Sequence, residues 1–382
     1  MRKYIGYIAI GCSAWINAQT ALYNIGNLEV HTGGQVGLHT NLINDGILDD
    51  NLGLVGFYGD TQLTVSGAFA PTFFDLEIAN PNNVVLQTGI NTFNTTNFIT
   101  GNFETPRTFT DSYLNYLFDA APTNSSNVSK VDGYAAITNK QNFIFPVGDA
   151  VQLSPLVLTS AELNQLAKCA YFFESANSPS TFPSFNTASK GEDVDLVSAT
   201  EFWRLEGNIP STVQLSWNER SAIPLLTDDP LALIVVGWSK ATNQWESLAG
   251  APSVGDITQG FVSSSSFVPD EYEILTLAST LGAPQELISI DNYLVTANGD
   301  GNNDSLVIPE LEQSPNNSLQ IFDRFGLKVF EMENYTDEFR GFANTGTIVM
   351  GKEKGLPTGV YFFVVEMRDL KLDFQGFLYL TR

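Results

Sequence analysis

Short apolar segments separated by tight-turn residues run through most of this chain, and they limit the folds that it can adopt. From about residue 20 to residue 130 the turns include Gly33-Gly34, Asn44-Asp45-Gly46 and Asn80-Pro81-Asn82-Asn83. Glycine and asparagine tolerate the backbone angles that such turns need. Segments that recur at about every 8–12 residues are typical of sandwiches, barrels and β-solenoids. The pattern therefore predicts a multidomain, all-β protein.

The turn signals and the composition divide the chain into four parts. Residues 1–18 form a candidate signal peptide, residues 19–130 a β-rich region of short strands, residues 131–282 a middle β region, and residues 286–382 a C-terminal unit. In the first β region, asparagine and glycine at repeated turns favour a β-solenoid. A sandwich remains the alternative there, because the turns do not align into a strict repeat.

The middle region is predicted to be a β-sandwich. Its apolar segments include Phe143–Gly148 and Val213–Trp217, and a hairpin is expected to pair Ala232–Trp238 with Trp245–Leu248. One short helix is expected at Ser160–Lys168, where Ser160 could cap the first turn and two leucines would share a face.

The C-terminal unit follows a linker at Gly282–Gln285. Leu319–Phe322 and Leu327–Phe330 flank a glycine-containing turn, which is a hairpin pattern. Gly359–Val365 and Phe374–Thr381 are strongly apolar strands. About six or seven strands in a unit of this size predict an Ig-like β-sandwich, and we expect the last strand to be part of the fold.

Charge limits the partners of the protein. The formal net charge is −24, although charged residues make up only 16% of the chain. An acidic chain repels nucleic acid and anionic membrane surfaces, so neither is expected as a partner. Cys12 and Cys169 are the two cysteines, and His31 and His39 are the two histidines. These residues leave little material for a zinc site or a Ser-His-Asp triad.

The first residues have the order of a secretory signal peptide. Arg2 and Lys3 precede an apolar run that ends near Ile16, too short for a membrane span. Cleavage after Ala18 is preferred and cleavage after Ala14 is an alternative. Processing as a lipoprotein at Cys12 is a third possibility. No other segment is long and apolar enough for a membrane helix, so no span is expected in the mature chain.

Four motifs in the C-terminal unit carry a family resemblance. They are Asn298-Gly299-Asp300-Gly301-Asn302-Asn303-Asp304, Leu319–Gly326 with Asp323-Arg324-Phe325-Gly326, Leu356-Pro357-Thr358-Gly359-Val360-Tyr361, and the terminal strand. In this order they resemble the gliding-motility-associated C-terminal domain, the type B sorting domain of type IX secretion cargo. The sequence departs from the family at Phe325 and at Phe339-Arg340-Gly341, where tryptophans are usual.

The resemblance implies a cell-surface or secreted protein that the type IX machinery recognises at the outer membrane. The sorting-motif residues are then Asn298, Gly299, Asp300, Gly301, Asp304, Arg324, Gly326, Pro357, Gly359 and Tyr361. The resemblance covers about a quarter of the chain and does not say what the remainder binds.

The acidic motifs are weighed as metal or catalytic sites. Asn298, Asp300, Asn302 and Asp304 alternate around glycines and could bind calcium, although a turn held by side-chain hydrogen bonds is favoured. The cluster Glu192, Asp193 and Asp195 is interpreted as a solvated turn. Asp49-Asp50 and Asp228-Asp229 are neighbours in turns, whereas a glycosidase needs two carboxyls facing each other across a sugar. No cofactor other than calcium is expected.

Three functions remain open. A non-enzymatic adhesive or structural surface protein is preferred, because no catalytic motif is present. A carbohydrate-binding protein is the second possibility, in which exposed tryptophans among Trp203, Trp217, Trp238 and Trp245 would stack on an extracellular glycan, although packing in the core is favoured for them. A hydrolase whose carboxylates meet only in the fold is the third.

Overall fold

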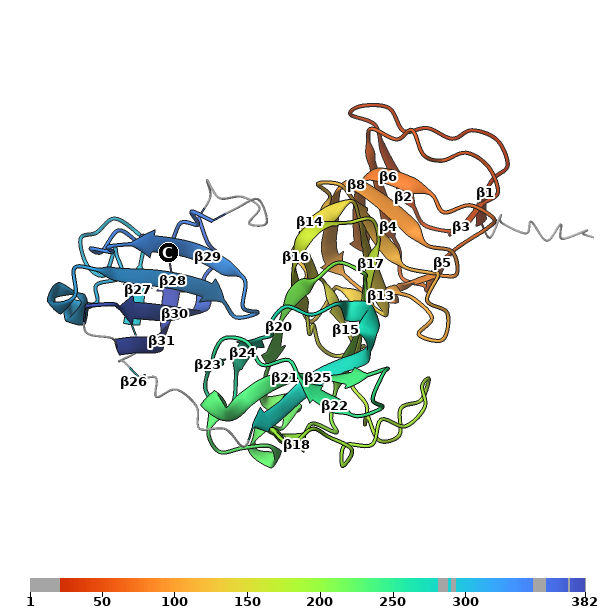
Figure 1. Cartoon of the computed structure of the whole chain (residues 1–382). Helices are drawn as coiled ribbons and strands as arrows, with labels where there is room; N and C mark the ends of the chain where they lie inside the picture. The colour runs from red at the N-terminus through yellow and green to blue at the C-terminus, as the bar shows by residue number, and fades with distance from the viewer. Residues whose placement is uncertain (1–20, 281–287, 290–292, 346–354, 370–371, 382) are drawn as a thin grey trace, which may run out of the picture.

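The computed structural model describes residues 21–280, 288–289, 293–345, 355–369 and 372–381. Four β-sheets account for nearly all of the regular structure in this part of the chain, and five short 3-10 turns supply the rest. The all-β prediction is confirmed (Figure 1). The candidate signal peptide, with its alternatives at Ala14, Ala18 and Cys12, lies outside the described residues.

The N-terminal region is a parallel β-solenoid. Seven of its strands form a parallel sheet, the first solenoid sheet, in the order β1-β3-β5-β7-β9-β12-β15. These strands are Ala21–Asn24, Asn41–Asn44, Leu63–Ser66, Val84–Leu86, Phe103–Glu104, Val131–Asp132 and Val147–Gly148. Each coil of the chain therefore returns to this sheet one strand further along.

The other strand of most coils forms a second parallel sheet in the order β2-β4-β6-β8-β10-β13, with β11 also paired to β8. These strands are Gln35–Leu38, Leu54–Tyr58, Thr72–Ala79, Ile90–Thr100, Leu114–Leu117, Tyr134–Thr138 and, for β11, Ala121–Thr123. Of the two folds that the sequence left open for this region, the solenoid is confirmed.

Apolar side chains stack in rows inside the solenoid. Along the first solenoid sheet, the register aligns the fully buried residues Val84, Phe103, Val131 and Val147 in four successive strands. Burial of each large apolar side chain contributes about 1.5–3 kcal/mol to folding. These rows explain why short strands with few residues each form a stable region.

Buried asparagines at the turns connect one coil to the next. Asn24 Nδ2 donates to Asn44 Oδ1 at 2.7 Å, and Asn44 Nδ2 donates to the Phe69 carbonyl at 3.0 Å. Backbone groups that the sheets leave unpaired at the turns are satisfied in this way. Recurrent asparagine was the sequence signal for a solenoid, and these bonds are its physical reason.

The middle region continues the second solenoid sheet without a break. β13 pairs with the antiparallel strand β17, and the sheet runs on through β19, β25, β21 and β22, with β18 paired to β25. The added strands are Ala167–Phe172, Phe202–Glu206, Tyr272–Thr280, Leu233–Ser239, Trp245–Ser247 and, for β18, Val194–Val197. The hairpin that pairs Trp238 with Trp245 is confirmed.

A five-stranded antiparallel sheet packs against this extension, in the order β14-β16-β20-β24-β23. Its strands are Lys140–Phe145, Leu156–Asn164, Ser211–Trp217, Gly260–Ser263 and Val254–Gly255. The 3-10 turns η1 to η4 of this region are Glu219–Ser221, Ile223–Leu225, Pro230–Ala232 and Pro269–Glu271. One apolar core extends from Val30 in the solenoid to Leu277 in the sandwich. Solenoid and sandwich therefore form one body.

The helix expected at Ser160–Lys168 is wrong. Leu156–Asn164 belongs to β16, and Ala167 begins β17. β16 lies between β14 and β20, so pairing on both sides outweighs local helix propensity. Ser160 Oγ lies 2.8 Å from Ser211 Oγ on the neighbouring strand, and it caps no helix.

The C-terminal unit has its own core and one sheet of six described strands. They are β26 (Ile288–Ser289), β27 (Tyr293–Thr296), β28 (Asn317–Asp323), β29 (Lys328–Glu333), β30 (Gly359–Met367) and β31 (Leu372–Thr381), with the 3-10 turn η5 at Pro309–Gln313. The β28–β29 hairpin is confirmed, and β31 pairs with β30, β26 and β27. The last strand is thus part of the fold, as expected.

An aromatic contact joins the C-terminal unit to the sandwich. The ring of Phe261 on β24 lies 5.1 Å from that of Phe322 and 5.8 Å from that of Phe362, centroid to centroid. Val254 completes this small buried cluster.

None of the helical turns in the described part of the chain has the length and apolar character to cross a bilayer.

Candidate functional site

The Asn298–Asp304 loop is closed by its own side chains. Asp304 accepts hydrogen bonds from the backbone N–H groups of Gly299 and Gly301, each at 2.7 Å. These two bonds hold the pKa of Asp304 below its usual range. Asn298 Oδ1 accepts from Asp300 N, and Asp300 Oδ1 accepts from Asn302 N. The oxygen side chains proposed for calcium are thus used to form the turn, and calcium itself stays a prediction.

The Asp323–Gly326 turn is equally well defined. Asp323 Oδ1 accepts from Phe325 N at 2.8 Å and from Leu327 N at 2.9 Å. Burial raises the pKa of Asp323 to about 6, against the lowering effect of these bonds. Gly326 has φ +86°, and a Cβ there would lie 2.9 Å from the ring of Phe261. Glycine therefore allows both the turn and its approach to the sandwich. The Arg324 guanidinium lies over the Phe325 ring at 4.6 Å.

The Pro357–Tyr361 segment completes a local cluster of sorting-motif residues. The hydroxyl of Tyr361 donates to the Pro357 carbonyl at 2.8 Å. Arg324, Pro357, Gly359 and Tyr361 line one hollow of about 470 Å³, whose other wall is formed by residues 122–125, at the end of β11 in the solenoid. The Asn298–Asp304 loop does not line this hollow. The fold thus brings two of the motifs together and keeps the third apart.

The two departures from the family pattern affect different parts of the domain. Phe339 is fully buried and its ring lies 5.1 Å from that of Phe330, so it serves the core. Phe325 is half-buried beside Arg324 in the turn. A receptor contact would therefore be altered at Phe325 and not at Phe339.

Residues 288–380 contain a hydrophobic core of their own and surface turns held by hydrogen bonds. These residues match the family model described as the CHU_C type IX secretion signal domain. The match confirms the resemblance to a type B sorting domain, and it makes this chain a cargo of the type IX secretion machinery. The protein is therefore secreted or located at the cell surface. No curated protein and no solved structure matches the chain.

The tryptophans of the middle region are not placed to bind a sugar. Trp203 and Trp245 are fully buried, Trp217 is 2% exposed and Trp238 is 8% exposed. Trp203 Nε1 donates to the Ser154 carbonyl at 2.9 Å. The four residues are core residues, as the sequence favoured, and the idea that they form an exposed stacking platform is wrong.

The other candidate residues are dispersed. His31 pairs with Glu29, whereas His39 packs on the ring of Tyr58, so the two imidazoles do not form a common site. Asp49-Asp50 and Asp228-Asp229 are exposed pairs in turns. In the described ranges, no group of three or more His, Cys, Asp or Glu side chains is arranged to hold a metal ion.

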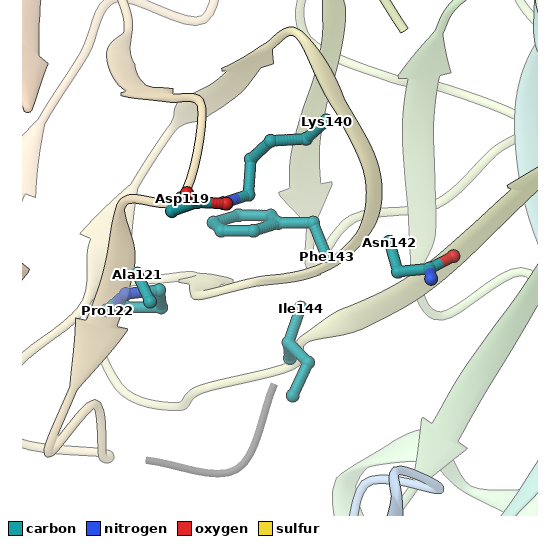
Figure 2. A pocket seen from close by; sticks show the side chains of 7 residues that line it. All are labelled: Asp119, Ala121, Pro122, Lys140, Asn142, Phe143 and Ile144. Carbon is teal, nitrogen blue, oxygen red and sulfur yellow. The ribbon is translucent and has the colours of Figure 1, made fainter. Parts of the chain in front are cut away.

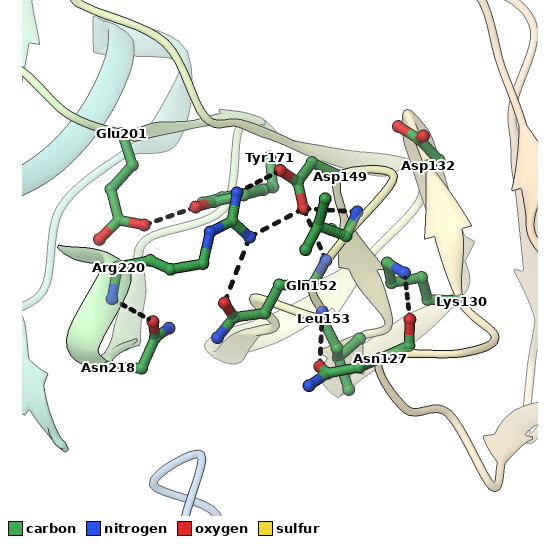
Figure 3. A network of polar contacts seen from close by, with 12 residues as sticks. Asn127, Lys130, Asp132, Asp149, Gln152, Leu153, Tyr171, Glu201, Asn218 and Arg220 are labelled. Atoms are coloured by element: carbon green, nitrogen blue, oxygen red, sulfur yellow. Dashed lines mark hydrogen bonds and ion pairs between the residues drawn. The ribbon is translucent and has the colours of Figure 1, made fainter.

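A polar cluster lies where the solenoid meets the sandwich (Figure 3). Arg220 in η1 donates two hydrogen bonds to Asp149, at 2.6 and 3.1 Å, and one to Gln152. Its guanidinium also lies 3.9 Å above the Phe173 ring. Burial would raise the pKa of Asp149, but the bonds from Arg220 and from two backbone N–H groups lower it overall. The cluster joins segments that are far apart in the sequence.

Glu201 and Lys130 are buried in the same cluster. Burial raises the pKa of Glu201, whose Oε2 accepts a bond from the Tyr171 hydroxyl at 2.6 Å. Burial lowers the pKa of Lys130, whose Nζ donates to the Asn127 carbonyl at 2.8 Å. Both groups are thus bonded to neutral partners, and their hydrogen bonds offset part of the cost of burying them.

The exposed aromatic residues of the body lie elsewhere, and sequence reasoning missed them. Phe74 on β6, Phe93 on β8 and Phe118 after β10 form a row across the even-numbered solenoid strands. Phe93 and Phe118 are 46% and 48% exposed, and Phe74 is half-buried. The sequence signal for this row is a phenylalanine at an outward position in each of several coils. It can be recognised only when the strand register that aligns the coils is known.

Proposed function

We propose that this protein is an adhesive or structural component of the cell surface, and that it acts by binding and not by catalysis. The observation that carries the proposal is the continuous sheet from β2 to β22, which makes the solenoid and the sandwich one body with a shared core. A body of this kind resists deformation and presents a broad sheet face. The sorting domain delivers it to the exterior.

The placement of the carboxylates supports a binding role. Asp149 is engaged by Arg220, and Glu201 accepts a bond from Tyr171. Asp304 and Asp323 hold turns of the sorting domain. These four carboxylates stabilise the fold, and a structural role explains their contacts without a catalytic one.

A deletion strain tests the proposal. We expect cells that lack the protein to attach less firmly to a surface, or to produce a less cohesive extracellular matrix, and we expect the full chain supplied in trans to restore both. Attachment and matrix that are unchanged in the deletion strain would contradict an adhesive or structural role.

A further inference from the structure

We propose that the outer face of the second solenoid sheet binds an extended, neutral glycan chain, along the row formed by Phe74, Phe93 and Phe118. The proposal rests on the adhesive function above and names its ligand. The residues involved are distinct from the buried tryptophans and from the sorting domain.

The three rings form a continuous apolar strip. The ring centroids of Phe74 and Phe93 are 6.3 Å apart with planes 22° from parallel, and those of Phe93 and Phe118 are 5.6 Å apart. Exposed aromatic surface that is continuous over several residues usually marks a binding site. The apolar C–H face of a pyranose is similar in size to a phenyl ring, so an extended chain can place successive sugars over successive rings.

Phe118 is held in an unusual backbone conformation. Its φ is +49°, in the left-handed region that bulky side chains rarely adopt. Its N–H donates to the Thr138 carbonyl at 2.9 Å. Lys140 Nζ donates to the Phe118 carbonyl at 2.5 Å and to the Ala120 carbonyl at 2.7 Å. Strained residues that their surroundings fix so firmly are concentrated at ligand sites.

Lys140 performs this task from the side of a hollow of about 280 Å³ (Figure 2). Its Nζ lies 5.5 Å from the centre of the Phe143 ring, and burial lowers its pKa to about 8. A half-buried cation thus fixes an exposed phenylalanine. Packing of the hydrophobic core does not by itself require a lysine that fixes the Phe118 turn.

Polar groups of fixed orientation flank the strip. Asp75 Oδ1 accepts hydrogen bonds from Asn94 Nδ2, at 2.8 Å, and from the Thr95 hydroxyl. Glu77 accepts from Tyr58 OH at 2.8 Å and from Asn97 Nδ2 at 2.7 Å. Groups that hold one another in place lose little entropy when a hydroxyl-rich ligand binds. Carboxylate oxygens also have further lone pairs with which to accept from sugar hydroxyls.

The charge of the face selects the class of glycan. Residues 21–100, which include Phe74 and Phe93, contain seven aspartates and glutamates and no lysine or arginine. At the Phe118 end, the ammonium group of Lys140 is engaged by two backbone carbonyls. Asp75 follows Phe74 on β6, and Glu77 lies two residues further along the same strand. An anionic polysaccharide would be repelled, whereas a neutral one would not. A neutral glycan is therefore the occupant that the face fits.

Calorimetric titration of the full chain tests the proposal with three neutral probes, namely cellohexaose, xylohexaose and mannohexaose, and with an alginate hexamer as the anionic probe. We expect binding of at least one neutral probe and none of alginate. Phe93→Ser should weaken that binding by about tenfold or more. Phe69→Ser is the matched control, because Phe69 is 60% exposed but lies in the turn before β6, and it should bind like the wild type.

Three results would overturn the proposal: no binding of any neutral probe, equal binding of alginate, or binding that Phe93→Ser leaves intact. Sedimentation analysis could give a fourth contradicting result. If the chain self-associates, if Phe93→Ser abolishes that self-association, and if no glycan binds, the phenylalanine row is a contact between copies of the chain. Equal melting temperatures of the two variants confirm that both fold. These measurements do not depend on export or cell attachment, so a failure here is distinct from a failure of the adhesive function.

Discussion

Lys140, the first residue of β14, is a lysine at which burial and charge oppose each other. Its pKa falls to about 8 from an ordinary value of 10.5 because desolvation disfavours the ammonium form. The two carbonyls that it bonds fix the Phe118 turn. The charge therefore costs stability, while the hydrogen bonds position an exposed ring.

The pH dependence of stability tests this description of Lys140. Between pH 8 and pH 10.5 the unfolded chain binds more protons at this lysine than the folded chain, so the free energy of unfolding rises with pH in this window. Lys140→Met should reduce that rise, which urea unfolding at pH 8.0, 9.0 and 10.0 would measure in both proteins. The pKa of Lys130 is also lowered, so Lys130 adds a similar rise of the free energy of unfolding with pH in the wild type and in Lys140→Met. Identical slopes would contradict the shift at Lys140.

Arg220 stabilises the junction between solenoid and sandwich. Arg220→Ala would leave Asp149 largely buried without its cation, and it should lower the free energy of unfolding by about 2 kcal/mol. Arg368→Ala is the control, since the ion pair of Arg368 with Glu333 is exposed and should matter little. Denaturant unfolding of both variants measures the difference. Equal effects would show that the junction cluster contributes no more than a surface pair.

At the scale of the element, the solenoid turns depend on close contact between coils. Gly101 has φ +80°, and a Cβ there would lie 1.7 Å from the Asn80 carbonyl oxygen. Gly101→Ala should destabilise the body by about 2–4 kcal/mol, because strain and a backbone clash add. Gly33→Ala has the same strain at φ +77° with no atom within 4 Å, and it should cost about 1 kcal/mol. Thermal unfolding compares them, and equal losses would exclude the clash.

The sequence predicted those elements whose signals are local. The β28–β29 hairpin follows from two apolar runs around Asp323–Gly326, and the β21–β22 hairpin from the turn between Trp238 and Trp245. Helix propensity at Ser160–Lys168 misled, because the pairing partners of β16 are distant in the sequence. The stacking of coils was only suggested, since no strict repeat sets their register.

The candidate sites divide in the same way. The sorting motifs are contiguous in the sequence and were recognised there. The row of Phe74, Phe93 and Phe118 was not, because its residues come from three coils and the spacing between them is unequal. Conversely, Trp203 and Trp245 look suited to sugar binding by residue type, but both lie in the core.

At the scale of the whole molecule, the protein combines a solenoid-sandwich body, for which we propose binding, with one export module. The body has a continuous sheet and a shared core, and residues 288–380 have a core of their own. The two parts touch through the Phe261, Phe322 and Phe362 cluster. Delivery and the proposed binding thus fall on different parts of the chain, and each can be tested without the other.

The most direct test of this account is localisation in a host with a working type IX system, comparing the full chain with a chain that ends at Pro284. The account predicts that the full chain reaches the surface or the medium, whereas the shortened chain, whose body still folds, stays inside the outer membrane. Equal export of the shortened chain would contradict the assignment of sorting to residues 288–380.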